Sequence, residues 1–363
     1  MNKILYLSGD GIPGKGLGKI YHKHFHNNSK NFFYVKEFRY KKASCDVINF
    51  SWWFGQPLTM TRLISLGVPG SVRVNNNVKI IVNAISRIII YWKLKNNSYD
   101  AIIFSDNLYF LNKDLLIYIK KLAPSLIILF SGVSPKSLLP LAHINSIPYF
   151  DTIIISDSGL KAEWEHLGGQ IVHVLPLSAA CPDTFHNILI NNKQNMDYDI
   201  VFIGRLDSPI YDYRLVILDY IVTNGINIKI WTPDKSDIEV NYPILGPQII
   251  GPAHGEKMVS ILSKSRIALN LHQPSVPNGG NIRLFEIPLT KTMQIADKCP
   301  TGWFKNGHEI VLFKNNDDLL IKIDYYLKNA KERIRIANNG YRRLLAEHTY
   351  KHRVENFLNL SHM

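Results

Sequence analysis

Cysteine is scarce in this 363-residue sequence, and the three cysteines present lie far apart. Cys45, Cys181 and Cys299 are odd in number and do not have the spacing of metal ligands. This scarcity excludes a disulfide framework and the zinc-finger class. We therefore expect a reducing compartment.

The sequence also lacks an uninterrupted apolar run long enough to cross a bilayer. Its most apolar long stretch, residues 78–95, is broken by Asn83, Ser86 and Arg87, so no membrane span is expected. Two interpretations stay open: an amphipathic helix packed on a core, or a helix lying on anionic lipid through its basic residues and Trp92. The N-terminal apolar run is too short for a signal peptide. We expect a cytoplasmic protein, at the inner face of the membrane if the second interpretation holds.

No block of like charges concentrates the positive charge of the chain. Lys and Arg number 42 against 29 Asp and Glu, which gives a net charge of +13. Such an excess points to polyanionic partners: nucleic acid, anionic lipid headgroups or the diphosphate of a small substrate. Nucleic acid is the least favoured, because neither a zinc-finger spacing nor an aromatic-glycine RNA-binding signature is present.

A glycine-rich stretch at residues 9–18, GDGIPGKGLG, nearly matches the phosphate loop of nucleoside triphosphatases. Gly9, Gly14 and Lys15 fit that pattern, but Gly16 stands where a Ser or Thr hydroxyl would bind Mg²⁺. The missing hydroxyl argues against a triphosphatase. A glycine loop that lets the backbone approach a ligand, or a purely structural turn, explains the stretch better.

Short apolar runs alternate with helical patterns along the whole chain, which is typical of parallel sheets with crossover helices. The length favours two domains. We expect a first α/β domain over 1–185, a second over 186–345 and a C-terminal helix over 346–363, with a helix break near Gly340. The polar stretch at 178–197 is the expected linker. The expected strands are residues 3–7, 99–105, 125–130, 150–156 and 171–176, then 198–204, 226–232, 266–271, 292–297 and 309–314.

Residues 279–286, GGNIRLFE, form a candidate phosphate site. Two glycines precede an expected helix start, whose free N–H groups suit a diphosphate. Arg283 adds a guanidinium fork for phosphate oxygens. Glu286 lies about one turn later on the same face, where its carboxylate could accept hydrogen bonds from ribose hydroxyls. The alternative is a surface Arg–Glu pair without a ligand.

Over roughly its last hundred residues the chain resembles a known family. Seven pieces agree in order and spacing: RIALNLH, NIRLFEI, Asp297, FKNGHEIVLF, LLIKIDYYL, ERIRIANNGYRR and EHTYKHR. They resemble the carboxyl half of the CgeB/YkvP-like glycosyltransferases, which belong to the GT-B glycosyltransferases. Upstream, VFIGRL and residues 150–186 resemble the junction of the two GT-B domains. The resemblance implies two Rossmann-like domains facing each other across a cleft, with C-terminal helices crossing back to the N-terminal domain.

The resemblance also implies roles for single residues. Glu286 would bind the ribose of a nucleotide-sugar donor, and Asn281 and Arg283 would face its diphosphate. Asn270 and His272 end a strand at the same crevice, although His272 fits the edge of a core equally well. The residues assigned to donor binding are Gly16, Gly204, Arg205, Asn270, His272, Asn281, Arg283 and Glu286.

Two departures from the family pattern concern the sugar pocket. Thr290 and Lys291 stand where the family usually has a small residue and a glycine. Relatives with two glutamates eight positions apart would have one at position 278, where this chain has Asn278. Only the second carboxylate, Glu286, is present.

The expected reaction is transfer of a sugar from a nucleotide diphosphate to a saccharide, lipid-linked or protein acceptor, in bacterial surface polysaccharide synthesis. GT-B enzymes generally stabilise the leaving diphosphate with helix N-termini and basic side chains, so no metal and no cofactor are expected. If the reaction inverts configuration, Asp10 or Asp106, and less favourably Asp157, would be the base, unless these residues only cap helices. A retaining reaction requires no protein base. Sugar-nucleotide epimerisation and non-catalytic nucleotide-sugar binding are the alternatives.

Overall fold

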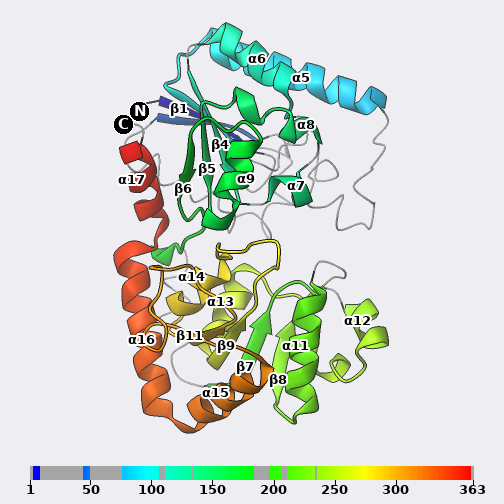
Figure 1. Cartoon of the computed structure of the whole chain (residues 1–363), viewed down its shortest axis with the longest axis vertical. Coiled ribbons are helices and arrows are strands. Elements are labelled where there is room, and N and C mark those ends of the chain that lie inside the picture. Colours follow the sequence, from blue (N-terminus) through cyan, green and yellow to red (C-terminus); the bar gives the residue numbers. More distant parts are fainter. Residues whose placement is uncertain are drawn as a thin grey trace. The chain divides into compact units, whose positions relative to one another are not determined.

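The computed structural model describes residues 3–8, 44–49, 76–105, 111–123, 125–132, 134–139, 141–183, 196–206, 211–233 and 235–360. The chain divides into two compact units (Figure 1). Unit 1 combines Met1–Leu177 with Arg353–Met363, and unit 2 is Ser178–His352. The sequence places the corresponding boundaries after residues 185 and 345, whereas the structure places them after 177 and 352.

Unit 1 is built on a six-stranded sheet in the order β2-β1-β3-β4-β5-β6, in which every pair is parallel. Its strands are β1 (Lys3–Ser8), β2 (Ser44–Asn49), β3 (Ala101–Ser105), β4 (Leu126–Ser131), β5 (Thr152–Ile155) and β6 (Val172–Val174). Its helices are α5 (Asn76–Lys95), α6 (Lys113–Leu122), α7 (Pro135–Leu138), α8 (Leu141–Ile144) and α9 (Lys161–His166), with 3-10 turns at Ile147–Tyr149 and Ser158–Leu160.

Strand β2 is the one described strand that the sequence does not predict. Its segment, SCDVIN, is short and carries the acidic Asp46 in the middle, and such a residue is disfavoured in strands. Tertiary contacts compensate for it: the Asp46 carboxylate accepts a 2.6 Å hydrogen bond from the Tyr99 hydroxyl and pairs with Lys93 at 3.3 Å. Both partners lie about fifty residues away in the sequence, which explains why local propensity misses the strand.

Helix α5 covers the apolar stretch with two open interpretations. Ser86, Ile90 and Leu94, spaced by four, are buried, and the two aliphatic residues join the core of unit 1. Ile88 and Trp92 lie on another face and are more than half exposed. None of the helices within the described ranges has the length and hydropathy that a membrane crossing requires. Core packing therefore accounts for one stripe of α5 and leaves the Ile88–Trp92 stripe to solvent.

Side chains of the unit 1 sheet alternate between two buried faces, as expected for parallel strands covered on both sides. Leu5 and Leu7 of β1 join the core beneath α5, α6 and α9. On the other face, Tyr6 packs edge-on against Phe130, and Phe130 packs edge-on against Phe357 of α17 (Tyr350–Leu360) at 5.3 Å between ring centroids. The end of the chain thus belongs to unit 1, as the expected return of the C-terminal helices requires.

Unit 2 is built on a five-stranded parallel sheet in the order β11-β10-β9-β7-β8. Its strands are β7 (Tyr198–Ile203), β8 (Ile228–Trp231), β9 (Ser265–Asn270), β10 (Met293–Ala296) and β11 (Val311–Leu312). Its helices are α11 (Asp212–Thr223), α12 (Lys235–Asn241), α13 (Gly255–Ser263), α14 (Arg283–Leu289), α15 (Asn316–Lys328) and α16 (Ala330–Glu347), with a 3-10 turn at Gly246–Gln248.

Two cores lie on opposite faces of this sheet. Along β7, Ile200 and Phe202 pack with α11 and α15, whereas Val201 and Ile203 pack with α13 and α14. The strand order runs outward in opposite directions from β7 and β9, and right-handed crossovers then put the following helices on opposite faces. A topological switch point therefore lies between β7 and β9, where ligands bind in open α/β sheets.

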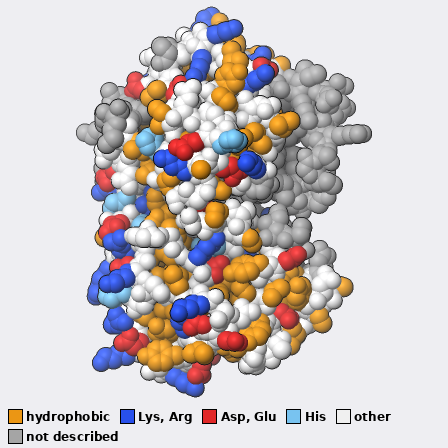
Figure 2. Space-filling model, in the orientation of Figure 1, with side chains coloured by type: hydrophobic (Ala, Val, Ile, Leu, Met, Phe, Trp, Pro, Cys, Tyr) orange, Lys and Arg blue, Asp and Glu red, His pale blue; other side chains and the backbone are white. Residues whose placement is uncertain are grey.

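The expected helix break near Gly340 is wrong, because α16 contains this residue. The helix continues through this glycine and ends at Glu347. Gly340 is required for packing: a Cβ built on it would lie 2.6 Å from the carbonyl oxygen of Glu309. Lys and Arg side chains gather over α16 in Figure 2, which agrees with the basic composition of this segment.

We expect Gly340→Ala to destabilise unit 2 by about 1 to 2 kcal/mol, because overpacking against a backbone oxygen outweighs the roughly 1 kcal/mol gain in helix propensity. Ala346→Gly, at an exposed position in the last turn of the same helix, is the control and should lose at most about 1 kcal/mol by propensity alone. Urea unfolding of both variants measures the effect. An alanine at position 340 that raises stability would contradict the close approach.

Candidate functional site

The candidate site lies at the carboxyl ends of β7, β9 and β10, around the switch point of unit 2. The chain leaves β7 at Gly204 and Arg205 and leaves β9 at Asn270, and both points carry residues that the sequence assigns to donor binding. Helices α11 and α14 then bring further polar side chains back to the same strand ends. The structure therefore gathers residues 204–205, 270–272, 281–286 and 297 in one region of unit 2.

Gly204 closes the end of β7 and leaves room for a neighbouring side chain. Its amide donates to the carbonyl oxygen of Trp231 at 3.0 Å. A Cβ on Gly204 would lie 2.9 Å from the Phe202 ring and 3.5 Å from Nη1 of Arg214. Nη1 of Arg214 in turn donates to the carbonyl oxygen of Arg205 at 2.9 Å. The backbone of Arg205 is thus engaged by Arg214.

Arg283 and Glu286 form an ion pair on the first turn of α14, with side chains only 18% and 12% exposed. Arg283 also donates from Nε to the carbonyl oxygen of Ile203 at 3.2 Å, and its Nη1 contacts the sulfur of Met258. This guanidinium therefore reaches from the helix after β9 to the last residue of β7. The pair is more enclosed than an ordinary surface Arg–Glu pair.

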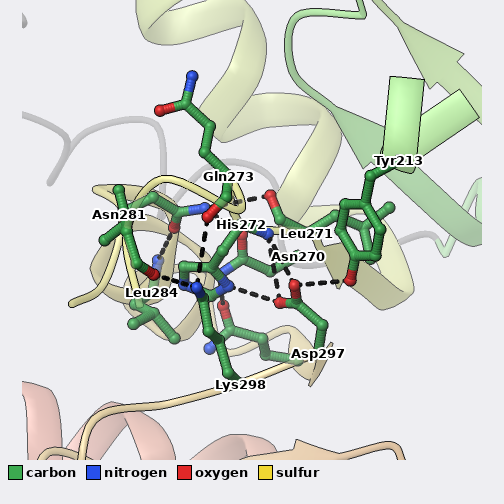
Figure 3. A network of polar contacts seen from close by, with 11 residues as sticks. Tyr213, Asn270, Leu271, His272, Gln273, Asn281, Leu284, Asp297 and Lys298 are labelled. Carbon is green, nitrogen blue, oxygen red and sulfur yellow. Dashed lines mark hydrogen bonds and ion pairs between the residues drawn. The ribbon is translucent and has the colours of Figure 1, made fainter. Parts of the chain in front are cut away.

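An amide network holds the start of α14 (Figure 3). Asn281 donates from Nδ2 to the side-chain oxygen of Asn270 at 2.7 Å, and its own oxygen accepts from the amide of Leu284 at 3.2 Å. Asn270 donates to Gln294 of β10 at 3.2 Å. Gly280 has a packing reason to lack a side chain, because a Cβ there would lie 2.5 Å from the Trp303 ring. Asn270 and Asn281 thus position the helix.

His272 and Tyr213 converge on Asp297, which follows β10 (Figure 3). The carboxylate lies 2.6 Å from Nδ1 of His272 and accepts from the His272 amide and, at 2.8 Å, from the Tyr213 hydroxyl. Burial alone would raise the pKa of Asp297, but the hydrogen bonds from His272 and Tyr213 outweigh it and lower that pKa. Burial and the neighbouring Asp297 raise the pKa of Tyr213. Asp297 is therefore ionised, and it orients His272 through Nδ1.

Two more titratable side chains lie near Arg283. Burial lowers the pKa of Arg214, and the like charge of Arg283 acts in the same direction, whereas Tyr211 and Asp297 oppose it. Burial, followed by the charge of Arg283, lowers the pKa of His254, which precedes α13. The region therefore contains the guanidiniums of Arg214 and Arg283, an imidazole whose charged form is disfavoured, and the carboxylates of Glu286 and Asp297.

The sequence does not single out Tyr213, Arg214 or His254 as site residues. A signal for Arg214 exists: it shares the buried stripe of α11 with Ile217, Leu218 and Ile221, and an arginine in an apolar stripe at this spacing is unusual. Asp297 follows an expected strand directly, at the end where ligands bind. The sequence uses it only as part of the family resemblance.

The departure from the family at Lys291 has a backbone counterpart. Lys291 has a φ of 55°, a left-handed conformation that favours glycine. Its ammonium lies 4.6 Å from the centre of the Tyr341 ring, a cation–π contact that offsets part of the strain. Thr290 bonds to the carbonyl oxygen of Ile287 and to Thr292. The chain therefore keeps the backbone conformation that a glycine would give.

The candidate bases are placed only in part. Asp10, Asp106 and the glycine loop with Gly16 lie outside the described residues, so their roles stay predictions. Asp157 is described, and its carboxylate accepts from the amide of Gly159 at 2.8 Å, as a cap of the short turn that follows. This bond fits the capping interpretation of Asp157.

The sequence contains one Asp-X-Asp triplet, Asp197-Tyr198-Asp199, which lies away from the candidate site and does not argue for a metal there. It lies at the amino end of β7, where Asp197 pairs with Lys264 at 3.2 Å and Asp199 pairs with Arg266. The candidate site is at the opposite end of that strand. Across the described part of the chain, no group of three His, Cys, Asp or Glu side chains could hold a metal ion.

Comparison with known proteins agrees with this architecture. Residues 216–359 match the model of a family described as glycosyl transferase-like, so less than half of the chain is covered. That segment includes α14 and the strand ends of β9 and β10. Among curated protein sequences no match is found.

Solved structures match over nearly the whole chain at low sequence identity. HepE (Alr3699) from Anabaena, in complex with UDP-glucose, is 11% identical with a TM-score of 0.62, covering 98% of this chain and 99% of that one. Sucrose-phosphate synthase from Thermosynechococcus elongatus is 11% identical with a TM-score of 0.69, covering 100% and 98%. The N-terminal domain of trehalose-6-phosphate phosphatase from Candida albicans is 13% identical with a TM-score of 0.66, covering 99% and 98%. The predicted fold class is confirmed: two Rossmann-like units with parallel sheets, as in GT-B glycosyltransferases.

Proposed function

We propose that the protein is a glycosyltransferase whose unit 2 binds a nucleotide-sugar donor at the carboxyl ends of β7, β9 and β10. The donor diphosphate would lie against the guanidinium of Arg283, and the ribose hydroxyls would donate to Glu286. His272, oriented by Asp297, would border the same donor. The acceptor would be a saccharide, a lipid-linked sugar or a protein.

One observation carries this proposal. Arg283 and Glu286 stem from the helix after β9, yet Arg283 bonds to the last carbonyl of β7, so the pair spans the switch point of the sheet. Guanidinium beside carboxylate at this place matches the two chemistries of a nucleoside diphosphate: anionic oxygens and hydroxyl donors. The glycosyl transferase-like segment covers α14, and HepE, a structure with the same fold, binds UDP-glucose.

The arrangement suits departure of a diphosphate from an anomeric carbon. Negative charge develops on the leaving phosphate oxygen, and preorganised cations lower the energy of that transition state more in an enclosed site than in water. Arg283 is held in place by Ile203 and Glu286 before any ligand arrives. We propose a metal-independent transfer on this basis.

A thermal-shift screen against UDP-, GDP-, dTDP- and CMP-sugars tests the proposal. A donor present at a hundred times its dissociation constant adds about 2.7 kcal/mol to the apparent stability. We expect one nucleotide class to raise the melting temperature without added metal. No shift with any class at millimolar concentration would contradict nucleotide-sugar binding, and isomerisation of the donor without acceptor would favour the epimerase alternative.

Other details of the proposal rest on the sequence. Membership of the CgeB/YkvP-like subfamily, a cytoplasmic location and a role in surface polysaccharide synthesis stay predictions. A peripheral contact with anionic membrane also stays a prediction, supported by the exposed Ile88 and Trp92 and by Lys95, whose ammonium lies over the Trp92 ring. Nothing in the described residues favours nucleic acid as a partner.

A further inference from the structure

Arg214 is a buried arginine with a donor that has no partner among the described residues. The residue is 8% exposed and stacks on the Tyr211 ring, with its guanidinium carbon 4.3 Å from the ring centre. Its Nη1 donates to the carbonyl of Arg205, but among the described residues its buried Nε has no partner. A buried cation with unsatisfied donors destabilises a fold unless an anion or another acceptor reaches it.

A second buried arginine shows what a structural role would look like. Arg333 of α16 is 9% exposed, and its Nη1 donates to the carbonyl oxygens of Tyr326 and Leu327 in the last turn of α15. A cation at a helix C-terminus is favoured both by free carbonyls and by the helix dipole. Helix packing therefore explains Arg333. Arg214 has one carbonyl partner, Arg205, and its buried Nε has none among the described residues.

Arg214 and Arg283 converge on one strand end from opposite faces of the sheet. Arg283 bonds to the carbonyl of Ile203 and Arg214 to the carbonyl of Arg205, and two residues of chain span at most about 7 Å. Glu286 is bonded to Arg283, and Asp297 is bonded to His272 and Tyr213. Arg283 thus has a carboxylate partner, whereas Arg214 forms no ion pair with any of the described carboxylates.

We propose that Arg214 is, beside Arg283, the second guanidinium that binds the diphosphate of the donor. This inference rests on the proposed function. A diphosphate carries charge on both phosphates, which matches two guanidinium groups that bond to carbonyls at the same strand end.

The proposal predicts opposite effects on stability and on binding. In Arg214→Met an apolar side chain of similar length replaces a buried cation, so the melting temperature without nucleotide should equal or exceed that of the wild type. Affinity for a nucleoside diphosphate should fall about ten-fold or more. Arg214→Lys keeps the charge but loses the planar fork, so its affinity should lie between the two. Arg333→Met, the matched control, should lower the melting temperature and leave nucleotide affinity unchanged.

Calorimetry with UDP, GDP and dTDP, each beside its own nucleoside, tests the proposal on the full chain. The expected result is a loss of diphosphate affinity in both Arg214 variants with unchanged affinity for the nucleoside. If the wild type binds no diphosphate, the proposed function fails and the inference with it. If the wild type binds and the Arg214 variants bind equally well, the inference is overturned while the function stands. A lower melting temperature in Arg214→Met with intact affinity would make Arg214 a structural residue, as Arg333 is.

Discussion

Replacing Asp297 with alanine is expected to lower the free energy of unfolding by about 3 to 5 kcal/mol, because several hydrogen-bond donors lose a shared, charged acceptor. The carboxylate accepts from the amide and Nδ1 of His272 and from the hydroxyl of Tyr213. Without it, three donors at a largely buried position lose their acceptor. Urea unfolding followed by circular dichroism measures the loss.

The pH dependence of stability gives this prediction a second measurement. The pKa of Asp297 is lowered in the folded protein, so the network contributes stability above the unfolded pKa of about 3.9, and the contribution is lost as the pH falls toward the folded pKa. Asp297→Asn cannot ionise and should show a shallower loss of stability below about pH 4 than the wild type. Tyr213→Phe, the control, removes one bond and should lose only about 1 kcal/mol. Equal stability of the wild type and Asp297→Ala would contradict the network.

Replacing Glu286 with alanine is expected to weaken binding of a nucleoside diphosphate by about 2 to 3 kcal/mol, roughly 30- to 150-fold. Two effects add. The ribose hydroxyls lose a charged acceptor, and Arg283 loses the carboxylate that holds its guanidinium beside Ile203. Calorimetry with the nucleotide selected by the thermal-shift screen measures the change.

Deoxynucleotides separate the ribose contact from the positioning of Arg283. If Glu286 accepts ribose hydroxyls, the wild type should prefer UDP to 2′-deoxy-UDP, or the matching pair of another base, and Glu286→Ala should lose that preference. Glu332 of α16 makes an Arg–Glu pair of the same spacing with Arg335, but on an exposed surface. Glu332→Ala is therefore the control and should leave affinity and stability nearly unchanged. Undiminished affinity in Glu286→Ala would remove its assigned role.

Much of the fold can be predicted from the sequence because the signal is local. Ten of the described strands, all except β2, lie in mainly apolar segments bounded by small or polar residues, and all ten are expected from these local patterns. Strand β2 escapes prediction because contacts with Tyr99 and Lys93, distant in sequence, stabilise Asp46 in it. The expected break at Gly340 is wrong for a related reason. The glycine is needed because the backbone of Glu309 packs closely against it, and it does not mark the end of its helix.

The candidate site is predictable only where one short segment carries it. Arg283 and Glu286 stand three residues apart on a single helix, so their spacing alone places them on one face. Tyr213 and Arg214 come to the site from α11, about seventy residues earlier in the sequence, and only the apolar stripe of that helix indicates that Arg214 is buried. Only the strand order β9-β7 puts that helix and α14 around the same strand end. The Arg283–Glu286 pair can therefore be predicted from local spacing, whereas the position of α11 beside it depends on the strand order of the sheet.

A crystal structure of the chain with its preferred nucleoside diphosphate would show where the nucleotide binds. We expect a diphosphate within hydrogen-bond distance of Arg283 and Arg214, with the ribose against Glu286. A nucleotide bound elsewhere in the chain, with Arg283 still paired to Glu286 and no ligand at the ends of β7 and β9, would contradict it.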